Sequence, residues 1–142
     1  MFETPGILDR LNKLGENCML ETLGIQFTEV GENYICATMP VDQRTTQPFG
    51  ILHGGASVTL AETLGSVAST ILIDTKRQLA VGLEINANHL KSASAGETVT
   101  GKVLPLHIGR KTHVWEIKIT NASNKLICVS RLTVSIIDRE NK

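Results

Sequence analysis

Between His53 and Ile73 the chain runs through 21 residues with a single charged side chain, Glu62. A helix with one side in water carries several charged or amide side chains on that side. This stretch carries only Glu62, so it predicts a central helix that is covered on all sides. Because carboxylates are rarely buried without a partner or a function, we expect Glu62 to be largely buried and to mark the functional site.

The same stretch has the length of a membrane span, since about 20 residues cross a bilayer. It also contains three glycines, three serines and three threonines besides the glutamate. That polarity is too high for a helix exposed to lipid, so we interpret it as the core helix of a soluble fold.

Hydrophobic alternation predicts strands on both sides of this helix. Residues 1–22 are expected to form one or two short helices, with one apolar stripe of Ile7, Leu8, Leu11 and Leu14. Two strands should precede the central helix and about four should follow it in hairpin succession. This order predicts a single domain over residues 1–142, an α+β fold in which a curved antiparallel sheet wraps around one long helix. The expected strands are Gly24–Val30, Tyr34–Met39, one from Gln78 that alternates at Val81, Leu83, Ile85 and Ala87, then Val99–Leu104, His113–Ile119 and Leu126–Ile137.

At about 100° per residue, two faces of the central helix can be separated. The apolar face opposite Glu62 should pack on the sheet and carries Leu60, Leu64, Val67 and Ile71. The face around Glu62 is small and weakly polar and carries Gly55, Val58, Gly65, Ser66 and Ser69. Small side chains allow close approach, so this second face should meet a ligand, a partner subunit, or both.

The spacing of Gly54 and Glu62 predicts a homodimer. A helix that begins near Gly54 has free amide N–H groups there, which suit a developing negative charge. Glu62 lies eight residues further on, about 12 Å along the axis, so the two groups of one chain cannot act on one carbonyl carbon. A second copy of the helix, antiparallel about a two-fold axis, would bring Gly54 of one chain near Glu62 of the other.

Composition narrows the classes of function. Fourteen basic and fourteen acidic residues cancel, so no overall basic footprint for nucleic acid or a membrane surface exists. The three cysteines are odd in number and widely spaced, and the first residues lack an apolar signal core, so we expect reduced thiols in a cytoplasmic protein. The four histidines match no zinc spacing, and we expect no metal and no cofactor.

Five segments resemble the hotdog-fold acyl-CoA thioesterases: Met39–Asp42, Gln47–Gly50, Leu52–Ser57, Leu60–Thr63 and Gly82–His89. The likeness covers about Leu11 to Ile137 and is greatest to the branch, of the phenylacetate-degradation type, that hydrolyses 1,4-dihydroxy-2-naphthoyl-CoA in menaquinone synthesis. It implies a dimer with sites at the subunit interface, commonly doubled to a homotetramer, and an acyl-CoA substrate.

The resemblance also implies residue roles. Glu62 would be the catalytic carboxylate, as nucleophile or general base, and the Gly54 amide would polarise the thioester oxygen. Gln47 and His53 would position the acyl carbonyl, and Ser66 would hold the hydrolytic water. Contacts to CoA would come from Gly82, from His89, Leu90, Lys91 and Ser92, and from His107, Ile108, Gly109, Arg110, Lys111 and Thr112. Lysine and arginine suit the phosphates of CoA.

Other interpretations of the same residues stay open. Glu62 could be a structural carboxylate, His53 a helix cap and His89 an ordinary core group, while His107 and His113 are expected at the surface or an edge and Trp115 in the core. Besides hydrolysis of aromatic acyl-CoA, alternative functions are a proofreading thioesterase for aryl-CoA or aryl carrier protein, a hydroxyacyl dehydratase and a non-catalytic acyl-CoA-binding module.

Overall fold

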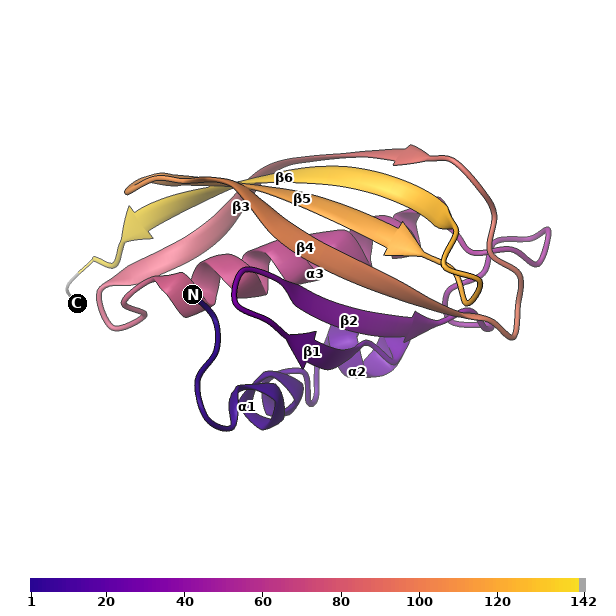
Figure 1. The fold of residues 1–142 in the computed structure, drawn as a ribbon, viewed down its shortest axis with the longest axis horizontal. Coiled ribbons are helices and arrows are strands. Elements are labelled where there is room, and N and C mark those ends of the chain that lie inside the picture. Colours follow the sequence, from indigo (N-terminus) through magenta and orange to yellow (C-terminus); the bar gives the residue numbers. More distant parts are fainter. Residues whose placement is uncertain (141–142) are drawn as a thin grey trace.

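Six antiparallel strands form one sheet, and a long helix lies across one face of it (Figure 1). The computed structural model describes residues 1–140, so the last two residues of the expected domain lie outside the described part. The predicted fold, a curved antiparallel sheet around one long helix, is confirmed. The helices are α1 (Ile7–Leu14), α2 (Met19–Leu23) and α3 (Gly54–Leu72), and the strands are β1 (Gln26–Val30), β2 (Ile35–Pro40), β3 (Gln78–His89), β4 (Thr98–Ile108), β5 (Thr112–Thr120) and β6 (Leu126–Asp138).

The strand order corrects one expectation about topology. Strands β4, β5 and β6 do follow one another as hairpins, but the order across the sheet is β1-β2-β4-β5-β6-β3. Strand β3 therefore pairs with β6 rather than with β4, the next strand in sequence. As a result β3 forms one edge of the sheet, with the side of the strand away from β6 unpaired by any described element.

Helix α3 lies close to the sheet because glycines leave room on both elements. A Cβ atom at Gly101 of β4 would lie 2.6 Å from a methyl carbon of Leu64, and one at Gly65 would lie 2.6 Å from a methyl carbon of Leu132. Leu60 and Leu64 are fully buried, as predicted for the apolar face. Gly65 and Ser69 were expected on the open face beside Glu62, but both are buried against the sheet.

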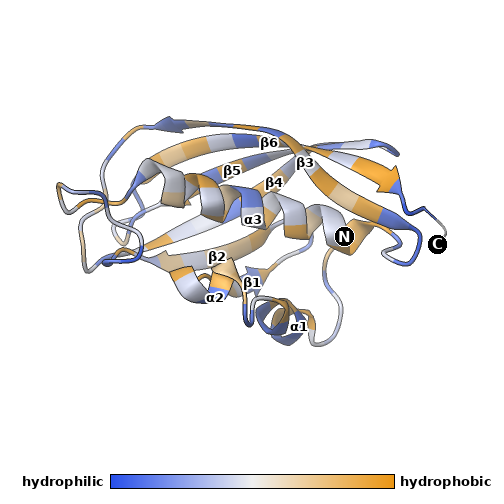
Figure 2. Ribbon diagram, turned by 180° about the vertical axis from the view of Figure 1, so that it is seen from behind, coloured by the Kyte–Doolittle hydropathy of each residue, from blue (hydrophilic) through white to orange (hydrophobic). Residues whose placement is uncertain are grey.

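The contact face of α3 is thus turned by roughly 60° from the expected one, at about 100° per residue. The side away from the sheet carries Thr59, Glu62, Ser66 and Thr70, which are exposed or half-buried. Figure 2 shows no helix or strand in front of α3 in that view. Within residues 1–140 no helix is both long and apolar enough to cross a bilayer.

Strand β3 contains a bulge that the alternation pattern did not predict. Its register against β6 shifts between Gly82 and Glu84, so Leu83 is the extra residue. Ile85 and Ala87 pack against the core as expected, whereas Val81 is 43% and Leu83 66% exposed. The bulge reverses which face the following side chains point to, so Val81 and Leu83 remain exposed on the edge strand β3.

Candidate functional site

The first turn of α3 leaves one amide without a partner. The His53 side chain caps the helix, because its Nδ1 accepts a hydrogen bond of 2.8 Å from the Gly55 N–H. The Ala56 and Ser57 amides donate to the His53 carbonyl oxygen. Among the described residues no acceptor is found for the Gly54 N–H. A free donor at the positive end of a 19-residue helix is suited to an oxyanion.

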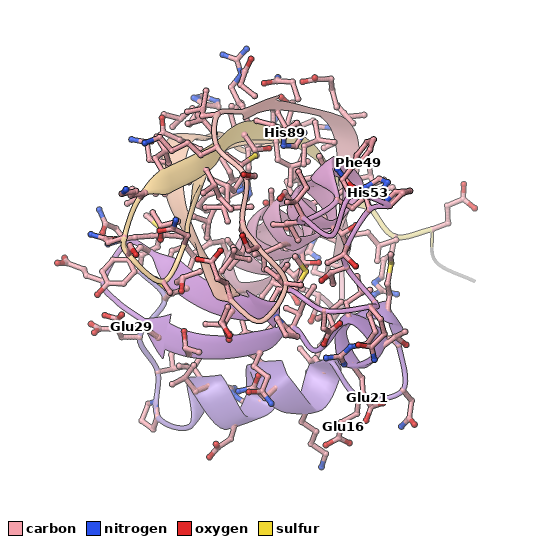
Figure 3. All side chains as sticks on the ribbon, turned by 90° about the vertical axis from the view of Figure 1, so that its right-hand side faces the viewer. Glu16, Glu21, Glu29, Phe49, His53 and His89 are labelled. Atoms are coloured by element: carbon pink, nitrogen blue, oxygen red, sulfur yellow. The ribbon has the colours of Figure 1, made fainter. Side chains whose placement is uncertain are left out.

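Gly54 lines a hollow of about 400 Å³, together with several other predicted site residues. The His89 ring packs against Gly54, since a Cβ atom added at Gly54 would be 2.9 Å from Nε2 of His89. Gln47 also lines the hollow; its Oε1 accepts from the Phe49 N–H, so its NH₂ group remains available as a donor. Figure 3 shows His53, Phe49 and His89 at this end of the molecule. Predicted residues in the hollow are Gln47, Gly54, His89, Leu90, Lys91 and Ser92, and His53 caps the adjoining helix.

Glu62 lies in a second hollow, of about 380 Å³, together with Ser66. Its side chain is exposed in the single chain, which corrects the expectation of burial. The reason is that, within residues 1–140, α2 only borders this side of α3, through Met19 and Leu20, and no helix or strand lies over it. Within residues 1–140 the Glu62 carboxylate has no ion pair and no hydrogen-bond partner. A Cβ atom at Gly82 would lie 2.8 Å from Oε1 of Glu62, so the glycine makes room for the carboxylate.

The remaining predicted contacts, His107–Thr112, lie at the opposite end of the sheet. They comprise the end of β4, the β4–β5 turn and the first residue of β5, and the Gly109 N–H donates to the Thr112 carbonyl oxygen. Arg110 and Lys111 line a third hollow of about 290 Å³ with Gln78, at the start of β3. His89 is at the other end of that 12-residue strand. At about 3.3 Å per residue, roughly 36 Å of strand separates the two sets of expected CoA contacts (Figure 1).

One predicted surface residue is in the core. His113 is 3% exposed, and its Nδ1 lies 3.1 Å from the Ser69 hydroxyl oxygen. The same oxygen accepts a hydrogen bond of 2.8 Å from Nε1 of Trp115, which is fully buried as predicted. Burial lowers the pKa of His113, the backbone of Gly109 opposes the shift, and the charge of His107 adds to it. These groups satisfy one another inside the protein and are not open to a ligand.

Sequence reasoning did not find the second wall of the Glu62 hollow. Met19 and Leu20, both from α2, face Thr59, Thr63 and Val67 across it. The helical angle could have placed the two threonines on the side of Glu62, at about 60° and 100° from it. No local signal joins a five-residue helix near the N-terminus to the centre of α3, because that contact depends on the tertiary fold.

Comparisons with known proteins agree on one family. The family model described as the thioesterase superfamily matches residues 49–128. The 1,4-dihydroxy-2-naphthoyl-CoA hydrolase of Escherichia coli is 50% identical over 92% of this chain and 94% of its own. The proofreading thioesterase EntH of Cronobacter sakazakii is 48% identical over 92% and 93%. The crystal structure of a thioesterase from Haemophilus influenzae has a TM-score of 0.88 at 50% identity, covering 92% of this chain and 90% of that one.

Proposed function

Because the chain belongs to the thioesterase superfamily, we propose that it hydrolyses aromatic acyl-CoA thioesters at sites shared between two subunits. Glu62 of one subunit and Gly54 of the other act on the same thioester carbonyl. The whole chain, residues 1–142, works as one thioesterase domain. The observation that carries this proposal is the unpaired Glu62 carboxylate on the open face of α3, too far from its own free Gly54 amide.

The open face of α3 supports a two-fold partner. It carries threonine and serine but, apart from Glu62, no charged residue, which is unusual for a helix side left in water. The β3 edge beside it keeps the apolar side chains of Val81 and Leu83 exposed. Edge strands of this kind pair with other chains, and a two-fold axis pairs them antiparallel.

The same symmetry would assemble the CoA site. Antiparallel β3 edges bring the Gln78 end of one subunit towards the His89 end of its partner. The β4–β5 turn, with Arg110 and Lys111, then approaches the partner's His89, so both sets of cationic contacts can reach one CoA molecule. Two such dimers would form the homotetramer that the family commonly adopts.

The proposed chemistry converts a thioester and water into a carboxylic acid and CoA. With Glu62 as general base, the carboxylate takes a proton from a water molecule that Ser66 holds, and the water oxygen attacks the thioester carbon. The partner's Gly54 N–H donates to the oxyanion, which collapses as the C–S bond breaks. The CoA thiolate leaves and takes the proton from Glu62. Gln47 and His53 position the acyl group.

With Glu62 as nucleophile, its oxygen attacks the same carbon, the thiolate leaves, and water hydrolyses the mixed anhydride. Single-turnover quenching followed by intact-protein mass measurement separates the two routes. If an acylated chain forms and decays at the rate of turnover, Glu62 acts as the nucleophile. If no acylated chain is detected during turnover, the result favours Glu62 as the general base.

For the acyl group we propose 1,4-dihydroxy-2-naphthoyl-CoA, after the relative of that name at 50% identity. A second candidate is a proofreading role, since a relative at 48% identity is a proofreading thioesterase. A thiol-release assay with naphthoyl, benzoyl and straight-chain acyl-CoA esters tests both. One ester with kcat/KM at least tenfold above the rest supports a dedicated hydrolase, and similar values across many acyl groups support proofreading.

Mixing two inactive variants tests the shared site. When Glu62→Ala and Gln47→Ala chains are mixed one to one, half of the dimers are heterodimers. If Glu62 and Gln47 act across the interface, each heterodimer has one intact site. The mixture should therefore regain about one quarter of wild-type activity by counting sites in a two-fold dimer. If mass spectrometry proves subunit exchange and activity stays at parental level, the composite site is wrong.

A further inference from the structure

The Glu62 hollow has a wall that none of the proposed catalytic roles uses. On one side stands the open face of α3, and on the other stands α2, which contributes Met19 and Leu20. These two side chains face the carboxylate across a space of about 380 Å³. That volume is at the lower end of the range for small-molecule sites, about 300–1,000 Å³.

The residues that line this space are apolar apart from Glu62, Ser66 and two threonines, Thr59 and Thr63. Met19 and Leu20 bring no polar group that ionises or donates. The Thr59 hydroxyl is already engaged, because it donates to the Gly55 carbonyl oxygen at 3.0 Å within the helix. A group that fills the space beside the carboxylate must therefore be largely hydrocarbon.

Hydrogen bonds fix the backbone of helix α2, but the Met19 side chain is left largely uncovered. The Ile25 N–H donates to the Leu20 carbonyl oxygen at 2.9 Å, and the Asn17 N–H donates to the Glu21 carboxylate at 2.7 Å. Leu20 packs partly against the core. The Met19 side chain is nevertheless 57% exposed. A fixed backbone thus presents a flexible, polarizable side chain to open space, and methionine adapts to varied apolar and aromatic surfaces.

We infer that Met19 is a specificity-determining residue, which packs on the apolar acyl group of a thioester whose carbonyl lies at Glu62. Leu20 forms the base of the same acyl subsite. This inference rests on the proposed function for the position of the thioester. It adds that the α2 wall selects aromatic or other bulky hydrocarbon acyl groups over acetyl. Covering Met19 removes apolar surface from water and favours the larger group.

Substitutions of two sizes at position 19 test the subsite. Met19→Ala should lower kcat/KM for benzoyl- and naphthoyl-CoA by about tenfold and change that for acetyl-CoA by less than about twofold, on the scale of a lost hydrophobic contact. Met19→Trp should reduce naphthoyl-CoA turnover more than benzoyl-CoA turnover, because the indole shortens the space. Leu14→Ala is the matched control, since Leu14 is 70% exposed on α1 and lines no part of this hollow. It should leave all ratios unchanged.

Binding of non-hydrolysable thioether analogues gives a second measurement that needs no turnover. Weaker binding of the naphthoyl analogue to Met19→Ala, with acetyl analogue binding unchanged, supports the subsite even if no ester is hydrolysed, in which case only the proposed function fails. If Glu62→Gln abolishes hydrolysis but Met19 variants keep wild-type acyl ratios and affinities, the function stands and the subsite is overturned. A Met19→Ala chain that changes oligomeric mass in sedimentation while keeping those ratios makes Met19 a subunit contact and also overturns it. Failure of the wild-type chain to bind either analogue has the same consequence.

Discussion

Helix α3 carries polar side chains on two faces, and the fold provides partners for only one of them. Towards the sheet, the Ser69 hydroxyl is buried and bonded to Trp115 and lies 3.1 Å from a nitrogen of His113. On the open side, Glu62 and the Ser66 hydroxyl have no hydrogen-bond partner within residues 1–140. Both faces lie on one 19-residue helix with little charge, so composition alone does not separate them.

The two faces show how a structural polar group can be distinguished from a functional one. A buried hydroxyl without a hydrogen bond would be costly, so the chain supplies two neighbours for Ser69. A carboxylate left open among small uncharged residues, beside a glycine that makes room for it, is available to a substrate or a second subunit. Substitutions on the open face should therefore affect activity, and substitutions on the buried face should affect stability.

Removing the carboxylate gives the largest expected effect. Glu62→Gln keeps the shape of the side chain but neither accepts a proton nor attacks a carbonyl, so kcat should fall by about 10²-fold or more. Stability should be unchanged, because no described group bonds to Glu62. Thiol release and thermal unfolding measured on the same preparation check both. Activity near the wild-type level would remove Glu62 from the mechanism.

Truncating the buried hydroxyl should have the opposite outcome. Ser69→Ala leaves the Trp115 indole N–H without an acceptor in the core, and an unsatisfied buried group costs about 1–3 kcal/mol of unfolding free energy. The neighbouring Thr70→Ala is the control; Thr70 is exposed and should change stability by less than about 0.5 kcal/mol. Urea unfolding measures both. Equal stability of the two variants would mean that Ser69 is not structural.

The long helix and the class of fold were predictable because they depend on local pattern. A stretch of 21 residues with one charge predicts a helix against a sheet, and the regular alternation around Trp115 predicts β5, in which Trp115, Ile117 and Ile119 all face the core. The HGG motif likewise identified the helix start and its Gly54 amide.

Features that depend on long-range packing were not predictable from the sequence. The bulge at Leu83 has no local signature, so the alternation pattern wrongly assigns Val81 and Leu83 to the core face that Ile85 and Ala87 do occupy. The burial of His113 follows from its contact with Ser69, 44 residues away in sequence. The exposure of Glu62 in the single chain depends on which elements lie over α3 in the tertiary fold, and the residue pattern of the helix does not show that.

Adding a methyl group beside the carboxylate should give a smaller effect on activity. Gly82→Ala places a Cβ atom 2.8 Å from Oε1 of Glu62, and the flexible carboxylate can turn away from it. We expect activity to fall by about tenfold, equivalent to about 1.4 kcal/mol, with little change in stability. In the Glu62→Gln background the same substitution should add less than about twofold, because it acts through the carboxylate. An equal loss in both backgrounds would show that Gly82 acts elsewhere, for example on bound CoA.

The smallest effect should appear as a pH dependence of the buried face. Burial lowers the pKa of His113 below the unfolded value of about 6.5, so the unfolded chain binds the proton more readily. Stability associated with His113 is therefore complete above that value and is lost as the pH falls towards the lowered pKa of the folded state. The groups that face the ring are Ser69 and Trp115, the backbone of Gly109 and the imidazole of His107, whose charge adds to the shift. The His113→Gln variant lacks the titrating imidazole, so the unfolding free energy of this variant should decline less than that of the wild type between pH 7 and pH 5. If the unfolding free energies of the two chains, measured in urea, changed in parallel between pH 7 and pH 5, the burial of His113 would not affect its protonation.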